Sequence, residues 1–227
     1  HRRRASGVVG KVQLVAAPCH LRQLVAQLMM ISLKNVSKDF NNTNILNDIN
    51  LTINEGELVR IVGSNGCGKT TLLKIIAGLL KADGGNITYG EGCNIGAVIE
   101  NPSFIENETL LYNLKFLYNL KSKFSYDICK KYCDLFSLNI DSKIAIKKYS
   151  LGMRQKAAII QAVMENQNLI LLDEPTRGLD IDSMNQFDNL VKELKQEGKT
   201  IIICAHDGVE NINFDRIIEI KKGRIEE

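Results

Sequence analysis

The stretch Leu58–Leu80, LVRIVGSNGCGKTTLLKIIAGLL, decides the fold because it joins a strand pattern to a helix pattern through glycines. Leu58–Val62 is a dense apolar run of strand length, which is typical of a strand buried on both faces of a sheet. Thr70–Leu80 carries apolar residues at helical spacing and has Gly78 near its end, which predicts a helix. A buried strand that turns at once into a helix indicates an α/β core.

The turn between them has the spacing G-x-x-x-x-G-K-[ST], which binds nucleotide phosphates when a strand precedes it and a helix follows. Its glycines let backbone N–H groups point at phosphate oxygens, and the helix N-terminus adds partial positive charge. We expect Lys69 to reach the β- and γ-phosphates and the Thr70 hydroxyl to ligate Mg²⁺. The residues expected to contact the nucleotide here are Gly63, Ser64, Asn65, Gly66, Cys67, Gly68, Lys69, Thr70 and Thr71.

A second apolar run, Leu169–Leu172, ends in two acidic residues. A strand of this kind brings them to the carboxyl edge of the sheet, where ligands of α/β folds bind. We expect Asp173 to hold Mg²⁺ through water and Glu174 to polarise the water that attacks the γ-phosphate. The chain has no N/T-K-x-D motif for recognising guanine, so a GTPase is disfavoured.

The remaining patterns predict the order of the other elements. The predicted strands are Ile31–Val36, Ile49–Ile53, Ile87–Tyr89, Ile95–Ile99, Thr200–Cys204 and Arg216–Ile220, the last followed by a turn at Lys222-Gly223. The predicted helices are Leu110–Leu120, Tyr126–Phe136, Leu151–Met164 and Ser183–Gln196. This order indicates an α/β core with an N-terminal antiparallel β subdomain and an inserted helical subdomain at about residues 101–165. No internal repeat occurs, so residues 29–227 are expected to form one domain.

Residues 1–28 differ in composition from the rest of the chain, with five basic residues and no acidic one. Lys11 and Gln13 interrupt the apolar run that a secretory signal would need. Because a strand pattern follows Met29-Met30 at once, we expect a vector-derived or disordered extension, with a native targeting or regulatory arm as the alternative. Without these residues the chain has 24 basic and 26 acidic residues, and no basic stripe indicates nucleic-acid binding.

The distribution of apolar residues and cysteines bears on the location of the protein. The sequence contains no run of about 18 apolar residues, so a role at a membrane would need a partner that spans it. The six cysteines lack zinc-ligand spacing, and Cys67 lies inside the phosphate-binding turn. We therefore expect free thiols and a cytoplasmic location.

Between the two nucleotide motifs lies YSLGMRQ, residues 149–155, just before a predicted helix. It occupies the place of the LSGGQ signature of the ABC (ATP-binding cassette) ATPase family, and the chain resembles that family from Ile31 to Glu227. In this family the signature of one subunit contacts the γ-phosphate held by the other. The resemblance implies this contact for Ser150, Gly152 and Met153, through a hydroxyl group and a helix N-terminus.

The signature departs from the family pattern at three positions. Tyr149 replaces Leu, Leu151 replaces the first Gly, and Met153 replaces Gln. Loss of a glycine restricts how closely the backbone can approach the nucleotide. The variant resembles cassettes of exporters for peptide antibiotics of the bacitracin and lantibiotic types.

The resemblance assigns roles to four further positions. Gly178-Leu179-Asp180 resembles the D-loop, through which Asp180 would face the active site of the opposite copy. His206, at the end of a predicted strand, resembles the switch histidine that touches the γ-phosphate. Phe40 resembles the aromatic residue that stacks on adenine, with core packing as the alternative. Glu100 stands at the Q-loop position, usually Gln, where it could approach Mg²⁺ but adds negative charge beside the triphosphate.

The resemblance implies the ATP-hydrolysing subunit of an ABC transporter of exporter type, with Lys69, Glu174 and His206 as catalytic residues. It implies ATP and Mg²⁺ as cofactors, a homodimer on ATP binding, and an integral-membrane permease subunit that holds the chain at the inner face of the cell membrane. Two alternatives stay open. One is a soluble ABC ATPase acting on ribosomes or DNA, which the single cassette disfavours, and the other is a regulatory cassette that binds ATP with little turnover, which the intact catalytic residues disfavour.

Overall fold

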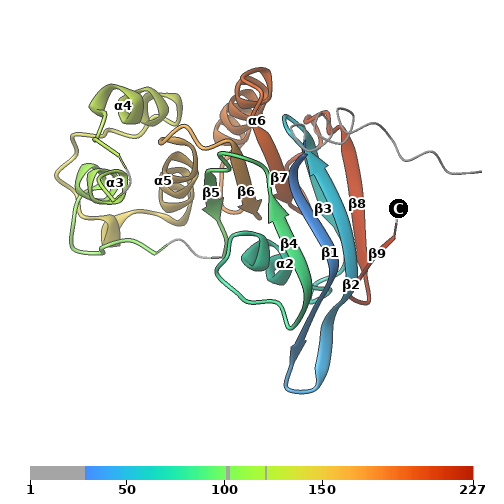
Figure 1. Ribbon diagram of the computed structural model, residues 1–227. Coiled ribbons are helices and arrows are strands. Elements are labelled where there is room, and N and C mark those ends of the chain that lie inside the picture. The colour runs from blue at the N-terminus through green and yellow to red at the C-terminus, as the bar shows by residue number, and fades with distance from the viewer. Residues whose placement is uncertain (1–28, 101–102, 121, 227) are drawn as a thin grey trace, which may run out of the picture.

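The structure, a computed structural model, describes residues 29–100, 103–120 and 122–226. The expectation for residues 1–28 therefore lies outside the described part of the chain. The structure contains two sheets and several helices arranged in layers (Figure 1). One group of helices lies on the side of the larger sheet that faces away from the smaller sheet (Figure 1). None of the helices in the described residues is long and apolar enough to cross a bilayer.

The larger sheet has the strand order β5-β6-β7-β3-β8-β9. Its strands are β3 (Leu58–Val62), β5 (Ile95–Val98), β6 (Leu169–Asp173), β7 (Thr200–Cys204), β8 (Arg216–Lys221) and β9 (Arg224–Glu226). All neighbours pair in parallel except β8 and β9, which form the antiparallel hairpin predicted around Lys222-Gly223. Every residue of β6 and of β7 is buried, as expected for central parallel strands covered on both faces.

The smaller sheet is antiparallel and has the order β2-β1-β4. Its strands are β1 (Met29–Phe40), β2 (Thr43–Asn54) and β4 (Gly84–Tyr89). Asn41 and Asn42 form the two-residue turn between β1 and β2, with φ of 47° and 62°. Asparagine tolerates this left-handed conformation, which matches the twist of a tight hairpin.

The helices lie on both faces of the larger sheet (Figure 1). They are α2 (Lys69–Ile76), α3 (Leu110–Tyr118), α4 (Tyr126–Leu135), α5 (Leu151–Val163) and α6 (Ile181–Gln196), with a short 3₁₀ turn at Ile146–Lys148. Helix α2 ends at Ile76, before the predicted Leu80, and the chain then turns at Gly78, where φ is 72°. Helices α3 and α4 lie beyond α5, at the end of the molecule away from the small sheet (Figure 1).

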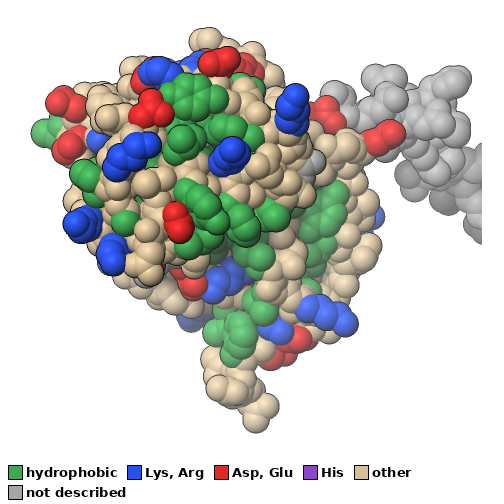
Figure 2. Space-filling model, turned by 90° about the vertical axis from the view of Figure 1, so that its left-hand side faces the viewer, with side chains coloured by type: hydrophobic (Ala, Val, Ile, Leu, Met, Phe, Trp, Pro, Cys, Tyr) green, Lys and Arg blue, Asp and Glu red, His purple; other side chains and the backbone are tan. Residues whose placement is uncertain are grey.

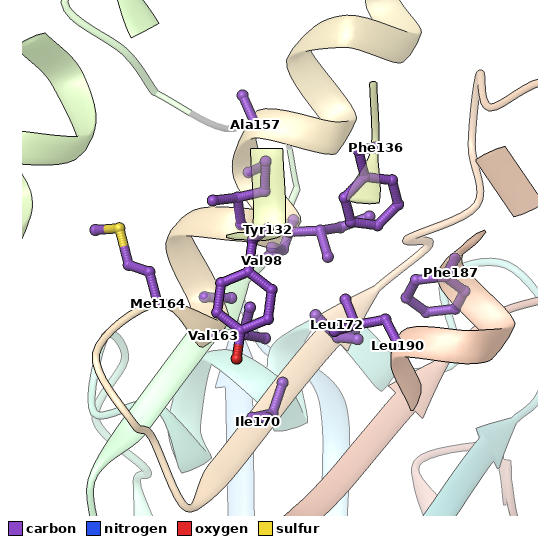
Figure 3. Close-up of a cluster of buried hydrophobic side chains, with 14 of the residues drawn as sticks. Val98, Tyr132, Phe136, Ala157, Val163, Met164, Ile170, Leu172, Phe187 and Leu190 are labelled. Carbon is purple, nitrogen blue, oxygen red and sulfur yellow. The ribbon is translucent and has the colours of Figure 1, made fainter. Parts of the chain in front are cut away.

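Two apolar cores meet across the larger sheet. Alternate residues of β6 point to opposite faces, as the pleat of a strand requires. Leu169 and Leu171 pack in the core that α2 shares with the small sheet, whereas Ile170 and Leu172 pack in the core beneath α5 and α6. Figure 3 shows that second core, in which Phe136 and Phe187 are fully buried.

The fold class predicted from the sequence is confirmed. The predicted strands and helices are present in the predicted order. The antiparallel sheet combines the two N-terminal strands, β1 and β2, with β4, which follows β3 of the larger sheet in the chain. Strands β1 and β2 are longer than predicted, because their pairing continues to the hairpin turn, where Phe40 lies opposite Thr43. The carboxyl ends of β3, β6 and β7 determine where the candidate site lies, because these strands are neighbours in the larger sheet.

The contact between β5 and α5 provides a test of the packing. Gly96 is buried, and a Cβ there would overlap the carbonyl oxygen of Ala162 on α5. We expect Gly96→Ala to lower the free energy of unfolding by about 1–3 kcal/mol, because either β5 or α5 must shift. Gly84→Ala is the matched control, since its Cβ would make only an ordinary contact with Ser37. Urea unfolding of both variants checks this, and equal stabilities would contradict the described contact.

Candidate active site

The phosphate-binding turn and two neighbouring strand ends surround a single cavity of about 580 Å³. The turn joins β3 to α2, Asp173 ends β6, and His206 follows β7. Because the three strands are parallel neighbours, their carboxyl ends open on the same edge of the sheet. The lining residues are Phe40, Ile45, Asn65, Gly66, Gly68, Lys69, Thr70, Thr71, Glu100, Leu151, Gln155, Asp173, Glu174, Arg177 and His206.

The cavity thus brings together most of the residues that the sequence predicted for nucleotide binding. Gly63, Ser64 and Cys67 belong to the same turn but do not line the cavity. At Gly63, with φ of 149°, a Cβ would overlap the carbonyl oxygen of Ile220 on β8. The turn therefore packs directly on the sheet at this glycine, which explains why no side chain fits there. Cys67 is buried behind the turn and carries a free thiol.

Lys69 is nearly buried, and its ammonium group lies at the centre of the turn. Its Nζ donates to the carbonyl oxygens of Gly63 at 2.7 Å and Ser64 at 3.2 Å, and lies 3.3 Å from His206 Nε2. A buried ammonium needs such partners, because removal from water without them is costly. A bound phosphate would offer the same ammonium a stronger, charged acceptor.

Thr70 and Asp173 place two oxygen atoms that could ligate a cation beside Lys69. The Thr70 hydroxyl donates to Asp173 Oδ2 at 2.6 Å. Burial raises the pKa of Asp173, while the bond from Thr70 and the charge of Lys69 act in the opposite direction. A divalent cation next to this buried carboxylate would compensate its charge.

The donor set at this position fits Mg²⁺. A hydroxyl and a carboxylate are hard oxygen ligands, and Mg²⁺ is usually bound by one or two carboxylates together with waters and substrate phosphates. The described residues contain no group of three or more His, Cys, Asp or Glu side chains that could enclose a metal ion by themselves. Thr70 and Asp173 could therefore hold Mg²⁺ only together with water and a nucleotide.

Glu174 follows Asp173 in a strained backbone conformation. Its φ is 46°, in the left-handed region that non-glycine residues rarely adopt. The backbone N–H donates to the carbonyl oxygen of Cys204 at 2.7 Å, and Gln155 donates to the carbonyl oxygens of Glu174 at 3.4 Å and Pro175 at 3.1 Å. These bonds hold the backbone so that the carboxylate faces His206, with Oε1 3.7 Å from Nε2. Such strain is often found at functional positions.

Phe40 and Ile45 form the apolar wall of the cavity. Phe40 is 44% exposed, so core packing does not account for it, and Lys38 Nζ lies 5.2 Å from the centre of its ring. An exposed aromatic ring at the edge of a nucleotide-sized cavity can stack on a base. Ile45, at the start of β2, adds to this wall and was not among the residues predicted from the sequence.

The signature residues lie at the N-terminus of α5. Ser150 caps this helix, because its hydroxyl accepts from the backbone N–H of Met153 at 3.2 Å. Gly152 packs against the carbonyl oxygen of Gly178, and Leu151 reaches the cavity wall. Ser150, Gly152 and Met153 themselves do not line the cavity of their own chain. Their predicted contact with a nucleotide of another copy stays a prediction.

Asp180 caps the next helix, α6. Its carboxylate accepts from the backbone N–H of Ser183 at 2.8 Å and also from the Ser183 hydroxyl. The hydrogen bond from the Ser183 side chain is the main reason why the pKa of Asp180 lies below its usual value. The capping role favours the ionised carboxylate at the N-terminus of α6. The predicted D-loop role of Asp180 is compatible with this position.

Glu100 forms an ion pair that the sequence analysis did not predict. Its Oε1 lies 2.6 Å from Lys74 Nζ on α2. Lys74 and Glu100 act in opposite directions on the pKa of Asp173, which Glu100 raises and Lys74 lowers. Lys74 thus offsets the charge that Glu100 adds beside the expected Mg²⁺ position. The position of Lys74 in the sequence, five residues after Lys69, did not indicate that it would pair with Glu100.

A parallel sheet in which one central strand, here β3, leads through this glycine-rich turn into a helix defines the class of P-loop nucleotide-binding proteins. Within that class, the ABC transporter family model matches residues 46–177, which is more than half of the chain. The chain therefore belongs to the ABC transporter family and corresponds to the ATP-binding domain of such transporters.

Individual relatives agree with this assignment. The chain is 35% identical to the uncharacterized ABC transporter ATP-binding protein YdbJ of Bacillus subtilis, over 86% of this chain and 68% of that protein. It is 31% identical to the lantibiotic transport ATP-binding protein SrtF of Streptococcus pyogenes, over 78% and 80%. A dimeric structure of the cassette MJ0796 bound to ADP and Pi matches with a TM-score of 0.78 and 28% identity, over 87% and 97%.

The pair Lys74–Glu100 gives a prediction about Mg²⁺. We expect Lys74→Met to weaken Mg²⁺-dependent nucleotide binding about two- to fivefold, because the uncompensated Glu100 carboxylate then faces the triphosphate. Lys74→Met combined with Glu100→Gln should recover most of this loss. Titration with a fluorescent ATP analogue at several Mg²⁺ concentrations measures the effect. Lys130→Met, which breaks an exposed pair with Asp134 on α4, is the matched control, and equal losses in the single and double variants would contradict the charge argument.

Proposed function

We propose that this chain is the ATP-hydrolysing subunit of an ABC transporter of exporter type, in which two copies enclose two ATP·Mg²⁺ and drive a separate membrane subunit. The observation that carries the proposal is the convergence of three side chains on one cavity. His206 Nε2 lies 3.3 Å from Lys69 Nζ and 3.7 Å from Glu174 Oε1. A cation for the phosphates, a carboxylate for the attacking water and an imidazole between them form a set of groups that can support hydrolysis of a γ-phosphate.

Each of these groups has a defined role in the proposal. Lys69 stabilises charge on the β- and γ-phosphates, and Thr70 and Asp173 hold Mg²⁺ beside them. Glu174 orients and polarises the attacking water, and His206 steadies that water against the γ-phosphate. The phosphate chain lies along the backbone N–H groups of the turn, and Phe40 stacks on adenine.

The proposed homodimer accounts for two exposed apolar side chains at the starts of α5 and α6. Leu151 is 54% exposed at the start of α5, and Ile181 is 73% exposed at the start of α6. Both follow directly on the residues assigned to trans contacts, Ser150 and Asp180. A second copy that closes on the cavity would cover these side chains and bring its Ser150 hydroxyl and α5 N-terminus to the γ-phosphate.

The membrane subunit is proposed to dock on the side of α3 and the segment before it. Figure 2 views the molecule from this side and shows apolar side chains gathered among basic and acidic residues. Exposed apolar residues there include Ile105, Tyr112, Phe116 and Leu120. Tyr112 and Phe116 are four residues apart and share one face of α3. Docking at this side would hold the chain at the inner face of the cell membrane.

Glu174→Gln tests the assigned role of the carboxylate. We expect the variant to bind ATP as the unchanged chain does but to turn it over at least about 100-fold more slowly, because the amide cannot act as a base. ATP should then trap a dimer, which light scattering after size exclusion detects. Asp182→Asn, an exposed acid in the first turn of α6, is the control and should behave as the unchanged chain. Normal hydrolysis by Glu174→Gln would refute the role.

Lys69→Ala tests the phosphate-binding turn. We expect ATP affinity to fall at least about tenfold, because the charge-assisted bonds to the phosphates are lost. Lys81→Ala removes an exposed lysine shortly after α2 and should leave the affinity unchanged. Equilibrium binding of a fluorescent ATP analogue compares the two variants, and unchanged affinity in Lys69→Ala would remove the basis for the nucleotide site.

A further inference from the structure

Arg60 on β3 hydrogen-bonds to the backbone that carries His206. Its guanidinium group donates to the carbonyl oxygen of Ala205, from Nε at 3.3 Å and Nη2 at 3.1 Å, and to that of His206, from Nη2 at 2.8 Å. The guanidinium carbon also lies 5.9 Å from the centre of the Phe214 ring. Arg60 is half-buried and does not line the nucleotide cavity.

These hydrogen bonds occur just after the end of β7, where the pairing between β7 and β3 stops. The ladder between β3 and β7 ends with the pair Ile61 and Cys204. The next two carbonyl groups, of Ala205 and His206, lie beyond the ladder and accept from Arg60 instead. Hydrogen bonds from a charged donor are stronger than those between neutral groups. Arg60 therefore fixes the first residues of the loop after β7.

The rest of the loop has its own anchors, so Arg60 has a local task. The Thr176 hydroxyl donates to the carbonyl oxygen of Asp207 at 2.9 Å. The Glu210 carboxylate accepts from the backbone N–H of Gly208 at 2.9 Å. The backbone of His206 itself has two side-chain partners: Arg60 donates to its carbonyl oxygen at 2.8 Å, and Glu174 Oε2 accepts from its N–H at 3.4 Å. Of the two, Arg60 lies outside the nucleotide cavity. Loss of Arg60 would thus change the position of the imidazole while leaving the remainder of the loop attached.

We propose that Arg60 is a positioning residue, which holds the imidazole of His206 within reach of Lys69 and Glu174 and so sets the rate of turnover without contacting the nucleotide. The proposal rests on the proposed function for the role of His206, and on the three hydrogen bonds for the role of Arg60. A displacement of about 1 Å in a catalytic group can lower a rate by about 100-fold. An effect through position changes kcat, whereas an effect through binding changes KM.

The test combines Arg60→Met with His206→Ala. We expect Arg60→Met to lower kcat about ten- to 100-fold with KM within about twofold, because the bonds to the carbonyl oxygens of Ala205 and His206 are lost. Arg60→Lys keeps a charged donor and should lie between Arg60→Met and the unchanged chain. Once His206 is replaced by Ala, Arg60→Met should cause no further loss of kcat. Arg216→Met is the matched control, because Arg216 is also half-buried and donates to a backbone carbonyl, that of Thr52 at 3.0 Å.

A direct measurement on His206 separates this proposal from the proposed function. Two-dimensional NMR of the imidazole nitrogens, assigned by the signal that His206→Ala removes, should show shifted His206 signals in Arg60→Met and Arg60→Lys but not in Arg216→Met. Unchanged His206 signals, or an equal loss of kcat with and without His206, would overturn the role of Arg60. Absence of ATP hydrolysis by the unchanged chain would refute the proposed function, and the NMR comparison would still decide whether Arg60 positions His206.

Discussion

The parallel pairing of β6, β7 and β3 is the constraint on which the rest of the structure depends. It places the carboxyl ends of three strands side by side, and each end leads into one part of the cavity. Strand β3 leads into the phosphate-binding turn, β6 into Asp173 and Glu174, and β7 into His206. A parallel sheet of this kind needs cover on both faces, which the two apolar cores provide. Burial of the parallel strands in these cores therefore fixes the geometry of the cavity. The loops that follow the strands need only a few local hydrogen bonds to hold their side chains in place.

Charge is the second constraint on this cavity. Lys69 and Asp173 are both nearly buried, and each lies against polar partners that satisfy it. Glu100 would add an unbalanced negative charge at the same edge, but Lys74 pairs with it at 2.6 Å. Glu100, which occupies the predicted Q-loop position, is thus accompanied by a basic residue on α2. The resulting charge near the expected Mg²⁺ position is closer to that of a neutral glutamine than the sequence alone suggests.

Much of the fold could be predicted from the sequence because its local patterns are strong. The apolar run Leu58–Val62, the glycines after it and the helical spacing beyond predicted the order of strand, turn and helix, as the structure confirms. The contacts of Arg60, Lys74 and Gln155 could not be predicted in this way. Each joins residues that are far apart in the chain, and a single polar side chain in a strand or helix is usually a solvated one. Only the pairing of the strands brings their partners within reach.

The hydrogen bonds around the cavity divide into two groups with different consequences. The bonds from Lys69 to the turn and from Thr70 to Asp173 involve groups that a nucleotide and a cation would also use, so ligand binding must exchange them. The bonds from Arg60 to the carbonyl oxygens of Ala205 and His206, and from Gln155 to those of Glu174 and Pro175, involve no such group. These bonds can persist through binding and hydrolysis. Exchangeable bonds keep buried charges satisfied, whereas persistent bonds hold the strained Glu174 backbone and the His206 loop in place. A site built in this way can exchange its ligands while the side chains proposed to be catalytic keep their positions. Repeated cycles of hydrolysis would require this of the site.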